Sequence, residues 1–220
     1  MTDARPKTLV AYGDSNTWGA ATQPRLDGRY GPDERWPGVL QRILGRDWRV
    51  IEEGLSGRTT VHADPVEGEW LNGADYLLPC LKSHAPVDLL IIALGANDLK
   101  ARFAVTAGDI AYSLGRLVQI ATSSGTARNG GAPAVIVVAP PPIPDYRPGF
   151  PDWRLMFDGA PAKSRALGPL VAAVARENGA RFLDAGQHIT VSETDGLHLD
   201  PEAHTALAKV IAEFILSNGL

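Results

Sequence analysis

The feature that most constrains the fold is the alternation of short apolar runs with longer segments of helical spacing. The runs cover residues 8–12, 48–53, 88–94, 134–139 and 181–184. Several of them are apolar throughout rather than at every second position, which is typical of parallel strands covered by helices on both faces. The sequence therefore predicts an α/β protein with a five-stranded parallel sheet.

The segments between these runs carry apolar residues three or four positions apart, which predicts helices with one buried face each. Pro201 lies near the start of the last one, where proline is favoured. Right-handed crossovers between parallel strands place such helices on both faces of the sheet, so we expect a three-layer α/β/α sandwich. The expected buried faces are Trp36, Val39, Leu40 and Ile43; Ala74, Leu77, Leu78 and Leu81; Ile110, Leu114, Leu117, Val118 and Ala121; Leu167, Leu170, Val171 and Val174; and Leu207, Val210, Ile211 and Phe214.

The composition indicates one globular domain over residues 1–220, because 45% of the residues are hydrophobic and 21% are charged. A proline- and aromatic-rich insertion at about residues 140–161 interrupts the alternation. It holds Tyr146, Phe150, Trp153 and Phe157. A loop of this length is typical of a lid or an oligomer contact, and it is equally compatible with an insertion that folds over the surface.

Charge and cysteine content exclude several classes of function. A net charge of -4 and a pI near 5.7 do not suit binding to the phosphate backbone, so we expect no nucleic-acid partner. The first residues are too acidic for a secretory signal and no apolar run is long enough to cross a membrane, so we expect a cytoplasmic protein without a membrane partner.

Cys80 is the only cysteine, which excludes an intramolecular disulfide and a zinc site built from cysteines. We interpret it as an inert packing residue.

Small and polar residues follow the predicted strands at the edge where ligands bind in open parallel sheets. They are Gly13-Asp14-Ser15-Asn16, Gly54-Leu55-Ser56-Gly57, Gly95-Ala96-Asn97-Asp98 and, later in the chain, Asp195-Gly196-Leu197-His198.

Ser15 needs a base to become a nucleophile, and His198 is the best candidate. Asp195 lies three residues before it, where its carboxylate can hold one imidazole nitrogen while the other faces the serine. The remaining histidines, His62, His84, His188 and His204, lie on loops, at helix ends or inside the last helix, without a carboxylate at a defined spacing. Each motif also has a structural interpretation, in which Asp14 or Ser15 caps a helix and Asp195 starts a turn.

Acyl transfer also requires hydrogen-bond donors for the oxyanion of the tetrahedral intermediate. Gly57 can bring its backbone N–H close to a substrate, and Asn97 offers a neutral side-chain N–H. Taken alone, Gly57 could be a turn glycine and Asn97 a helix cap. No Gly-x-Ser-x-Gly, P-loop or Gly-x-Gly-x-x-Gly motif occurs, which argues against the α/β-hydrolase plan and against nucleotide chemistry.

These blocks, in this order, resemble the SGNH hydrolases, also called the GDSL family of esterases and lipases. The stretches GDSNTWG, RWPGVL, VIEEGLSGRTT, LNGADYLLPCL and DGLH are similar to the bacterial arylesterase and acyltransferase branch. Two positions depart from the family pattern. Asn16 stands where the family name has Leu, and Glu52 stands where many members have Asn.

The resemblance implies a flavodoxin-like fold with strand order 2-1-3-4-5 and a cofactor-free enzyme without a metal. It makes Ser15 the nucleophile, His198 the base and Asp195 its orienting residue. The oxyanion hole would comprise the N–H groups of Ser15 and Gly57 and the side chain of Asn97. It also implies a homo-oligomer, for which the loop from residue 145 to 157 is the candidate contact.

We therefore expect a serine carboxylesterase that acts on a small-molecule ester with a short, acetyl-type acyl group through an acyl-enzyme, with acyl transfer to alcohols or peroxide as an extension. A carbohydrate O-acetyl esterase or a thioesterase would use the same triad. A metal-dependent phosphoesterase could use Asp14, Asp98 and His198. A non-catalytic binding module with a flavodoxin-like fold is the alternative from another class.

Substrate binding is assigned to Asp14 and Trp18, beside the nucleophile block. Trp18 would fill much of a small acyl pocket, although a tryptophan in the core is an equally good interpretation. Replacing Trp18 with Ala is expected to shift the preference toward longer acyl chains, measured with a series of p-nitrophenyl esters. An unchanged chain-length profile would remove Trp18 from the acyl pocket.

Overall fold

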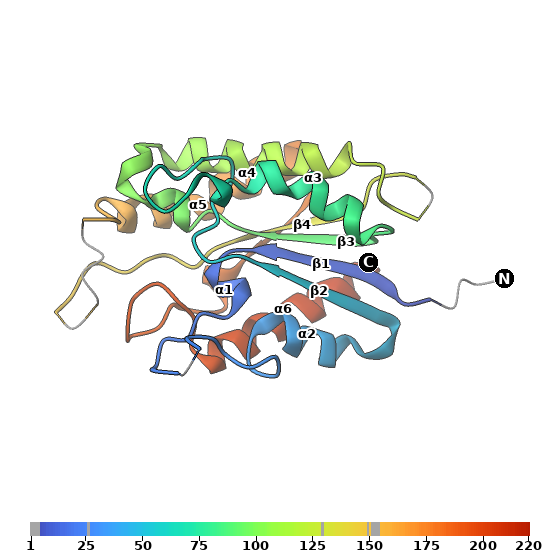
Figure 1. Ribbon diagram of the computed structural model, residues 1–220, viewed down its shortest axis with the longest axis horizontal. Helices are drawn as coiled ribbons and strands as arrows, with labels where there is room; N and C mark the ends of the chain where they lie inside the picture. The colour runs from blue at the N-terminus through green and yellow to red at the C-terminus, as the bar shows by residue number, and fades with distance from the viewer. Residues whose placement is uncertain (1–4, 26, 129, 149, 151–154) are drawn as a thin grey trace.

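The computed structural model describes residues 5–25, 27–128, 130–148, 150 and 155–220. Its centre is a five-stranded sheet in the order β2-β1-β3-β4-β5, in which every neighbouring pair is parallel (Figure 1). This confirms the predicted fold class and strand order. The strands are β1 (Lys7–Gly13), β2 (Trp48–Gly54), β3 (Leu89–Ala93), β4 (Ala134–Ala139) and β5 (Arg181–Asp184).

Helices cover both faces of this sheet, as predicted. One face carries α2 (Trp36–Leu44) and α6 (Pro201–Ser217), and the other carries α3 (Gly73–His84), α4 (Ala107–Thr122) and α5 (Ala160–Glu177). A further short helix that the sequence analysis did not predict, α1 (Ser15–Trp18), follows β1 directly. None of the helices in the described part of the chain is long and apolar enough to cross a membrane.

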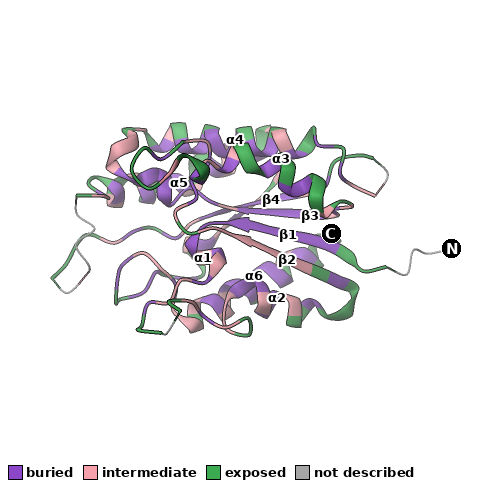
Figure 2. Cartoon of the chain, in the orientation of Figure 1, coloured by how far each residue is buried: buried purple, intermediate pink, exposed green. Residues whose placement is uncertain are grey.

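The sheet is buried because side chains from its two faces pack into two separate hydrophobic cores. In β1, Leu9 and Ala11 pack toward α2 and α6, whereas Val10 and Tyr12 pack toward α3, α4 and α5. Figure 2 shows β1, β3 and β4 as mostly buried strands between the two helical layers. The continuous apolar runs in the sequence thus reflect burial on both faces.

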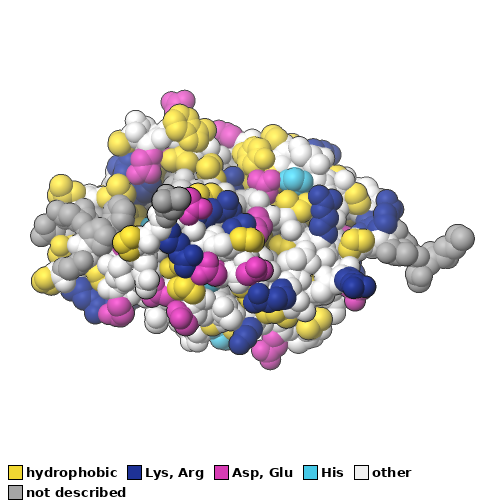
Figure 3. Space-filling model, turned by 60° about the horizontal axis from the view of Figure 1, so that its bottom comes forward, with side chains coloured by type: hydrophobic (Ala, Val, Ile, Leu, Met, Phe, Trp, Pro, Cys, Tyr) yellow, Lys and Arg dark blue, Asp and Glu magenta, His cyan; other side chains and the backbone are white. Residues whose placement is uncertain are grey.

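On the outside of the molecule, Figure 3 shows a face where basic side chains lie among acidic ones.

Three residues expected on buried helix faces are instead partly exposed: Ile43 (41%), Leu78 (41%) and Leu170 (39%). In α2, the inward position belongs to Leu44. The buried stripe is narrower than predicted in both α3 and α5. In α3 it includes Leu77, Cys80 and Leu81, and in α5 it includes Leu167, Val171 and Val174. Spacing alone predicts a wider stripe than these helices bury.

Strand ends also differ slightly from the prediction. β1 and β2 each extend to a glycine, Gly13 and Gly54, and β3 starts at Leu89 rather than at Asp88. The Asp88 carboxylate instead accepts the Thr8 N–H at 2.7 Å and pairs with Arg128 at 2.8 Å.

The described part of the proline-rich insertion packs against the loop that carries Asp195. Phe157 is buried, and Tyr146 and Phe150 meet edge to face with 6.4 Å between their ring centroids. These aromatic rings and Leu197 line an apolar cavity of about 50 Å³. Trp153 lies outside the described residues.

A buried histidine joins the two helices on one face of the sheet. His204 of α6 accepts the backbone N–H of Trp36, at the start of α2, through Nδ1 at 3.3 Å. This bond satisfies one of the N–H groups that a helix start leaves without an intrahelical partner. Burial lowers the pKa of His204 to about 4, so the ring is neutral in the folded protein near pH 7.

His204 should therefore make the fold acid-sensitive. Between pH 6.5 and about 4 the unfolded chain takes up a proton that folded His204 does not, so the free energy of unfolding falls as the pH falls. Compared with His204→Asn, which keeps an acceptor but no ionisable ring, the wild type should lose roughly 3 kcal/mol across this range. Urea unfolding of both proteins from pH 4 to 8 measures this difference. A difference that does not vary with pH would contradict the prediction.

Candidate active site

Ser15 stands at the sharp turn between β1 and α1. Asp14 caps the helix by accepting the N–H of Asn16 at 3.0 Å, and Ser15 is the first helical residue. Gly13 makes the turn possible, because a Cβ there would lie 1.9 Å from Oγ1 of Thr17. The buried strand thereby delivers the Ser15 hydroxyl to the carboxyl edge of the sheet.

The structure brings His198 and Asp195 to this hydroxyl. Nε2 of His198 lies 3.1 Å from Oγ of Ser15, and Nδ1 lies 2.7 Å from Oδ2 of Asp195. The other oxygen of Asp195 accepts the N–H groups of Leu197 and His198, each at 2.9 Å. Burial raises the pKa of Asp195, but the bonds from His198 and the two N–H groups outweigh burial, so the net pKa lies below its ordinary value.

Asn16 ties the segment that carries Ser15 to the loop that carries His198. Its Oδ1 accepts the N–H of Leu199 at 3.0 Å, and its Nδ2 donates to the carbonyl of Leu197 at 3.4 Å. These two residues flank His198. Asn16, at the position where the family name has Leu, thus acts as a polar clamp that holds the backbone on both sides of His198. The sequence analysis did not assign this role.

The predicted oxyanion donors lie beside Ser15. Gly57 has a φ of +84°, a conformation that favours glycine, and a Cβ there would lie 3.1 Å from Leu71. Asn97 is 7% exposed and donates through Nδ2 to the carbonyl of Arg58 at 3.2 Å. Ser15, Gly57, Asn97 and His198 all line one hollow.

Asp98 holds the loop after β2 in place. It is fully buried and accepts the N–H of Thr60 at 3.0 Å, the Thr60 hydroxyl at 2.6 Å and Nδ1 of His62 at 2.8 Å. Because Asn97 and Gly57 lie on the two segments that Asp98 joins, their relative position depends on this carboxylate. His62 thus has a carboxylate partner that the sequence analysis did not find, since the two residues are far apart in the chain.

Arg58 is a second residue that the sequence analysis missed. Its buried guanidinium donates to the carbonyls of Gly13, at 3.0 Å, and of Glu53, and lies 4.1 Å from the ring centroid of Tyr12. A buried arginine on backbone carbonyls fixes the ends of β1 and β2 to each other. Glu52, the other position that departs from the family pattern, pairs with Arg35 and with Arg29.

The hollow beside Ser15 has a volume of about 270 Å³ and two kinds of wall. Met156, Phe157 and Leu197 are apolar, whereas Glu67 and Lys100 are charged. Lys100 is 2% exposed, and its Nζ pairs with Glu67 at 2.6 Å.

Trp18 and Asp14 take positions outside this described lining. Trp18 is the last residue of α1, and the guanidinium of Arg29 lies 4.9 Å from the centroid of the Trp18 ring. Asp14 is buried, and burial raises its pKa to about 6. Their assignment to substrate binding stays a prediction.

The residues named for a metal-dependent phosphoesterase do not form a ligand set. Among the described residues, the group of three or more acidic, histidine or cysteine side chains whose ligand atoms all lie within 4.8 Å of one another is instead Glu53, Cys80 and His84. The carboxylate of Asp98 is occupied by Thr60 and His62.

Known proteins show the same architecture. The chain matches the GDSL-like lipase/acylhydrolase family over residues 11–206. An aryl esterase structure from M. smegmatis is 42% identical with a TM-score of 0.87, covering 96% of this chain and 99% of that one. A carbohydrate acetylesterase from Sinorhizobium meliloti is 37% identical with a TM-score of 0.88 and the same coverage of both chains.

A more distant structure shares the fold. This lipolytic protein of the G-D-S-L family from Veillonella parvula is 16% identical, with a TM-score of 0.62, and 97% of this chain and 100% of that one are covered. No curated protein sequence matches the chain significantly. The family match covers both Ser15 and His198, and the similar structures include esterases. The chain therefore belongs to the GDSL-like lipase/acylhydrolase family and is an ester hydrolase.

Proposed function

We propose that the chain is a serine carboxylesterase that hydrolyses short-chain, acetyl-type esters through an acyl-enzyme. The observation that carries this proposal is the line of hydrogen bonds from Ser15 to His198 to Asp195, which opens on a hollow shared with Gly57 and Asn97. A nucleophile, a base, an orienting carboxylate and oxyanion donors are the parts that acyl transfer requires.

In the first half of the reaction, Oγ of Ser15 attacks the ester carbonyl carbon and its proton passes to Nε2 of His198. The carbonyl oxygen becomes an oxyanion, which the N–H groups of Ser15 and Gly57 and the amide of Asn97 stabilise. Asp195 stabilises the imidazolium through Nδ1. The intermediate collapses, the C–O bond to the alcohol breaks, and His198 gives the alcohol its proton.

In the second half, water attacks the acyl-enzyme and gives a proton to His198. Collapse of this intermediate breaks the acyl–Oγ bond, releases the carboxylic acid and returns the proton to Ser15. An alcohol or a peroxide in place of water would carry the acyl group away by the same steps, so acyl transfer is part of this proposal.

The hollow also supports a carbohydrate O-acetyl esterase as the second candidate. Its charged wall of Glu67 and Lys100 offers hydrogen-bond partners for sugar hydroxyls, and its apolar wall of Met156, Phe157 and Leu197 suits an acetyl methyl group. The 37% identity to a carbohydrate acetylesterase favours the same substrate class. Activity on acetylated sugars measured beside p-nitrophenyl acetate separates the two candidates.

Two further predictions from the sequence are unchanged by the structure. We expect a cytoplasmic protein, and we expect homo-oligomers in which the loop from residue 145 to 157 forms the contact. Residues 149 and 151–154 of this loop lie outside the described part of the chain.

Replacing Ser15 with Ala should lower the hydrolysis of p-nitrophenyl acetate by on the order of a thousandfold or more, because the variant has no nucleophile. The measurement is kcat/KM for the purified wild type and variant, with folding checked by circular dichroism. Ser83→Ala on the exposed surface of α3 serves as the matched control and should keep full activity. Equal activity of the wild type and Ser15→Ala would exclude the proposed mechanism.

Replacing Asn16 with Leu, the residue in the family name, should lower kcat by roughly 10- to 100-fold and change KM little. The variant loses both hydrogen bonds to the residues that flank His198, so the ring no longer keeps its distance from Ser15. Steady-state kinetics beside Asn218→Ala, at the exposed end of α6, measure this effect. Full activity of Asn16→Leu would show that the loop holds His198 without the clamp.

A further inference from the structure

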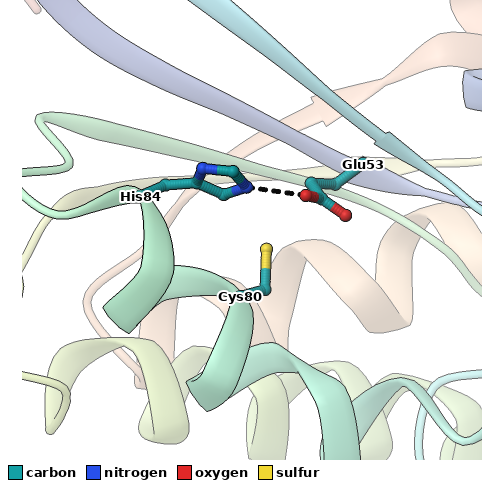
Figure 4. Close-up of side chains that lie close together, drawn as sticks. All are labelled: Glu53, Cys80 and His84. Atoms are coloured by element: carbon teal, nitrogen blue, oxygen red, sulfur yellow. Dashed lines mark hydrogen bonds and ion pairs between the residues drawn. The ribbon is translucent and has the colours of Figure 1, made fainter.

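A second group of reactive side chains lies outside the active site, between β2 and α3. Figure 4 shows the sulfur of Cys80 directed toward the pair formed by His84 and Glu53. Nε2 of His84 lies 2.7 Å from Oε1 of Glu53, and the ligand atoms of all three residues lie within 4.8 Å of one another. We propose that Glu53, Cys80 and His84 form a binding site for a borderline divalent cation of the Zn²⁺ type.

The secondary structure explains why these ligands meet. Cys80 and His84 are four residues apart on α3, so they lie on one face on consecutive turns. Glu53 is the penultimate residue of β2, the edge strand of the sheet that α3 covers. Sulfur, nitrogen and oxygen therefore come from two rigid elements, which is the arrangement that fixes a metal site best.

The dimensions suit tetrahedral coordination. Bonds of about 2.0 to 2.3 Å place the ligand atoms of a zinc site roughly 3.3 to 3.8 Å apart. The His84–Glu53 pair is closer than this in the structure, and no two ligand atoms of the trio are more than 4.8 Å apart, so binding a cation would require only adjustments of about an ångström in these separations.

Access from solvent also fits a cation with three protein ligands and one water, whereas burial raises the pKa of the Cys80 thiol, so the cation has to displace its proton. Cys80 is fully buried, whereas the side chains of His84 and Glu53 are 25% and 18% exposed, which leaves a path from solvent. The donor set selects the metal. A thiolate and an imidazole suit Zn²⁺, whereas Mg²⁺ and Ca²⁺ prefer sites made only of oxygen.

Binding requires a defined movement of protons. The Cys80 thiol gives its proton to water as the S–metal bond forms. In the structure Nε2 of His84 donates to the Glu53 carboxylate, so that proton leaves Nε2 and the ring takes one up at Nδ1 before Nε2 binds the metal. A dication and one new thiolate together add one positive charge to the site. The guanidinium of Arg58 donates to the backbone carbonyl of Glu53, and this nearby positive charge lowers the affinity for a cation.

The site would tie the end of α3 to β2 close to the active-site loop, because β2 ends at Gly54 and leads directly to Gly57. It shares no residue with the proposed triad. Metal binding is measured without an ester, so failure of this proposal and failure of the proposed esterase activity are separate results.

The test uses untagged protein with Co²⁺ as the spectroscopic probe and Zn²⁺ as the competitor. Cys80 is the only cysteine in the sequence, so any thiolate-to-cobalt charge-transfer absorption in the near ultraviolet belongs to this site and to no other. We expect the wild type to show this absorption and added Zn²⁺ to abolish it. Its absence at saturating Co²⁺ would overturn the proposal without reference to any variant.

Variants identify the other two ligands. The absorption should vanish in Cys80→Ala, and the Co²⁺ affinity should fall by more than about tenfold in Glu53→Gln and His84→Gln, because loss of even an outer partner costs roughly 10- to 100-fold. His188→Gln, which removes an exposed histidine on another element, should bind as the wild type does. Unchanged affinity in Glu53→Gln and His84→Gln would overturn the assignment.

Heat stability gives an independent measurement of the same site. Zn²⁺ should raise the Tm of the wild type and of His188→Gln, because a ligand that binds only the folded state stabilises it. It should leave the Tm of Cys80→Ala unchanged. An equal increase in Cys80→Ala would place the cation elsewhere and overturn the proposal.

Discussion

The parallel pairing of β1 with β2 and β3 is the constraint on which the active site depends. Its register sets Gly13 opposite Gly54 on one side and opposite Ala93 on the other. The loops that carry Ser15, Gly57 and Asn97 therefore leave the sheet at the same level. A shift of one residue would move every strand side chain to the opposite face, so burial of both faces fixes this register.

Buried polar groups then hold the loops at the aligned strand ends in a defined geometry. Asp98 and Arg58 carry charge in the interior, where a charge is tolerated only if its hydrogen bonds are satisfied. Asp98 satisfies its oxygens on Thr60 and His62, and Arg58 bonds to the carbonyl of Gly13. Neither residue lines the hollow beside Ser15. Both hold the loops that do.

The sequence is sufficient to predict the sheet, because burial on both faces leaves continuous apolar runs that are short enough to be strands. It also predicts the pairing of Asp195 with His198, since the two residues are only three positions apart and their hydrogen bond closes within one turn. The partners of His62 and His84 could not be predicted in this way. Asp98 and Glu53 lie more than thirty positions from them, and only the folded sheet brings them together.

Helix faces were predicted less well for a related reason. Periodicity shows which residues can share a face, but the neighbouring element determines how wide the buried stripe becomes. Ile43 and Leu78 lie at the edges of the buried stripes of α2 and α3, and they are partly exposed.

The loop that carries His198 is held from two sides, and this explains how Ser15 and His198, 183 positions apart, keep a hydrogen-bond distance of 3.1 Å. Asn16 bonds to the backbone on both sides of His198. Beyond the histidine, Asp200 accepts hydrogen bonds from Thr22 at 2.6 Å and from Ser192 at 2.9 Å. Thr22 and Asn16 both belong to the segment that follows Ser15. The same short stretch of chain therefore positions both Ser15 and His198, so movement of the histidine loop away from Ser15 requires both connections to break.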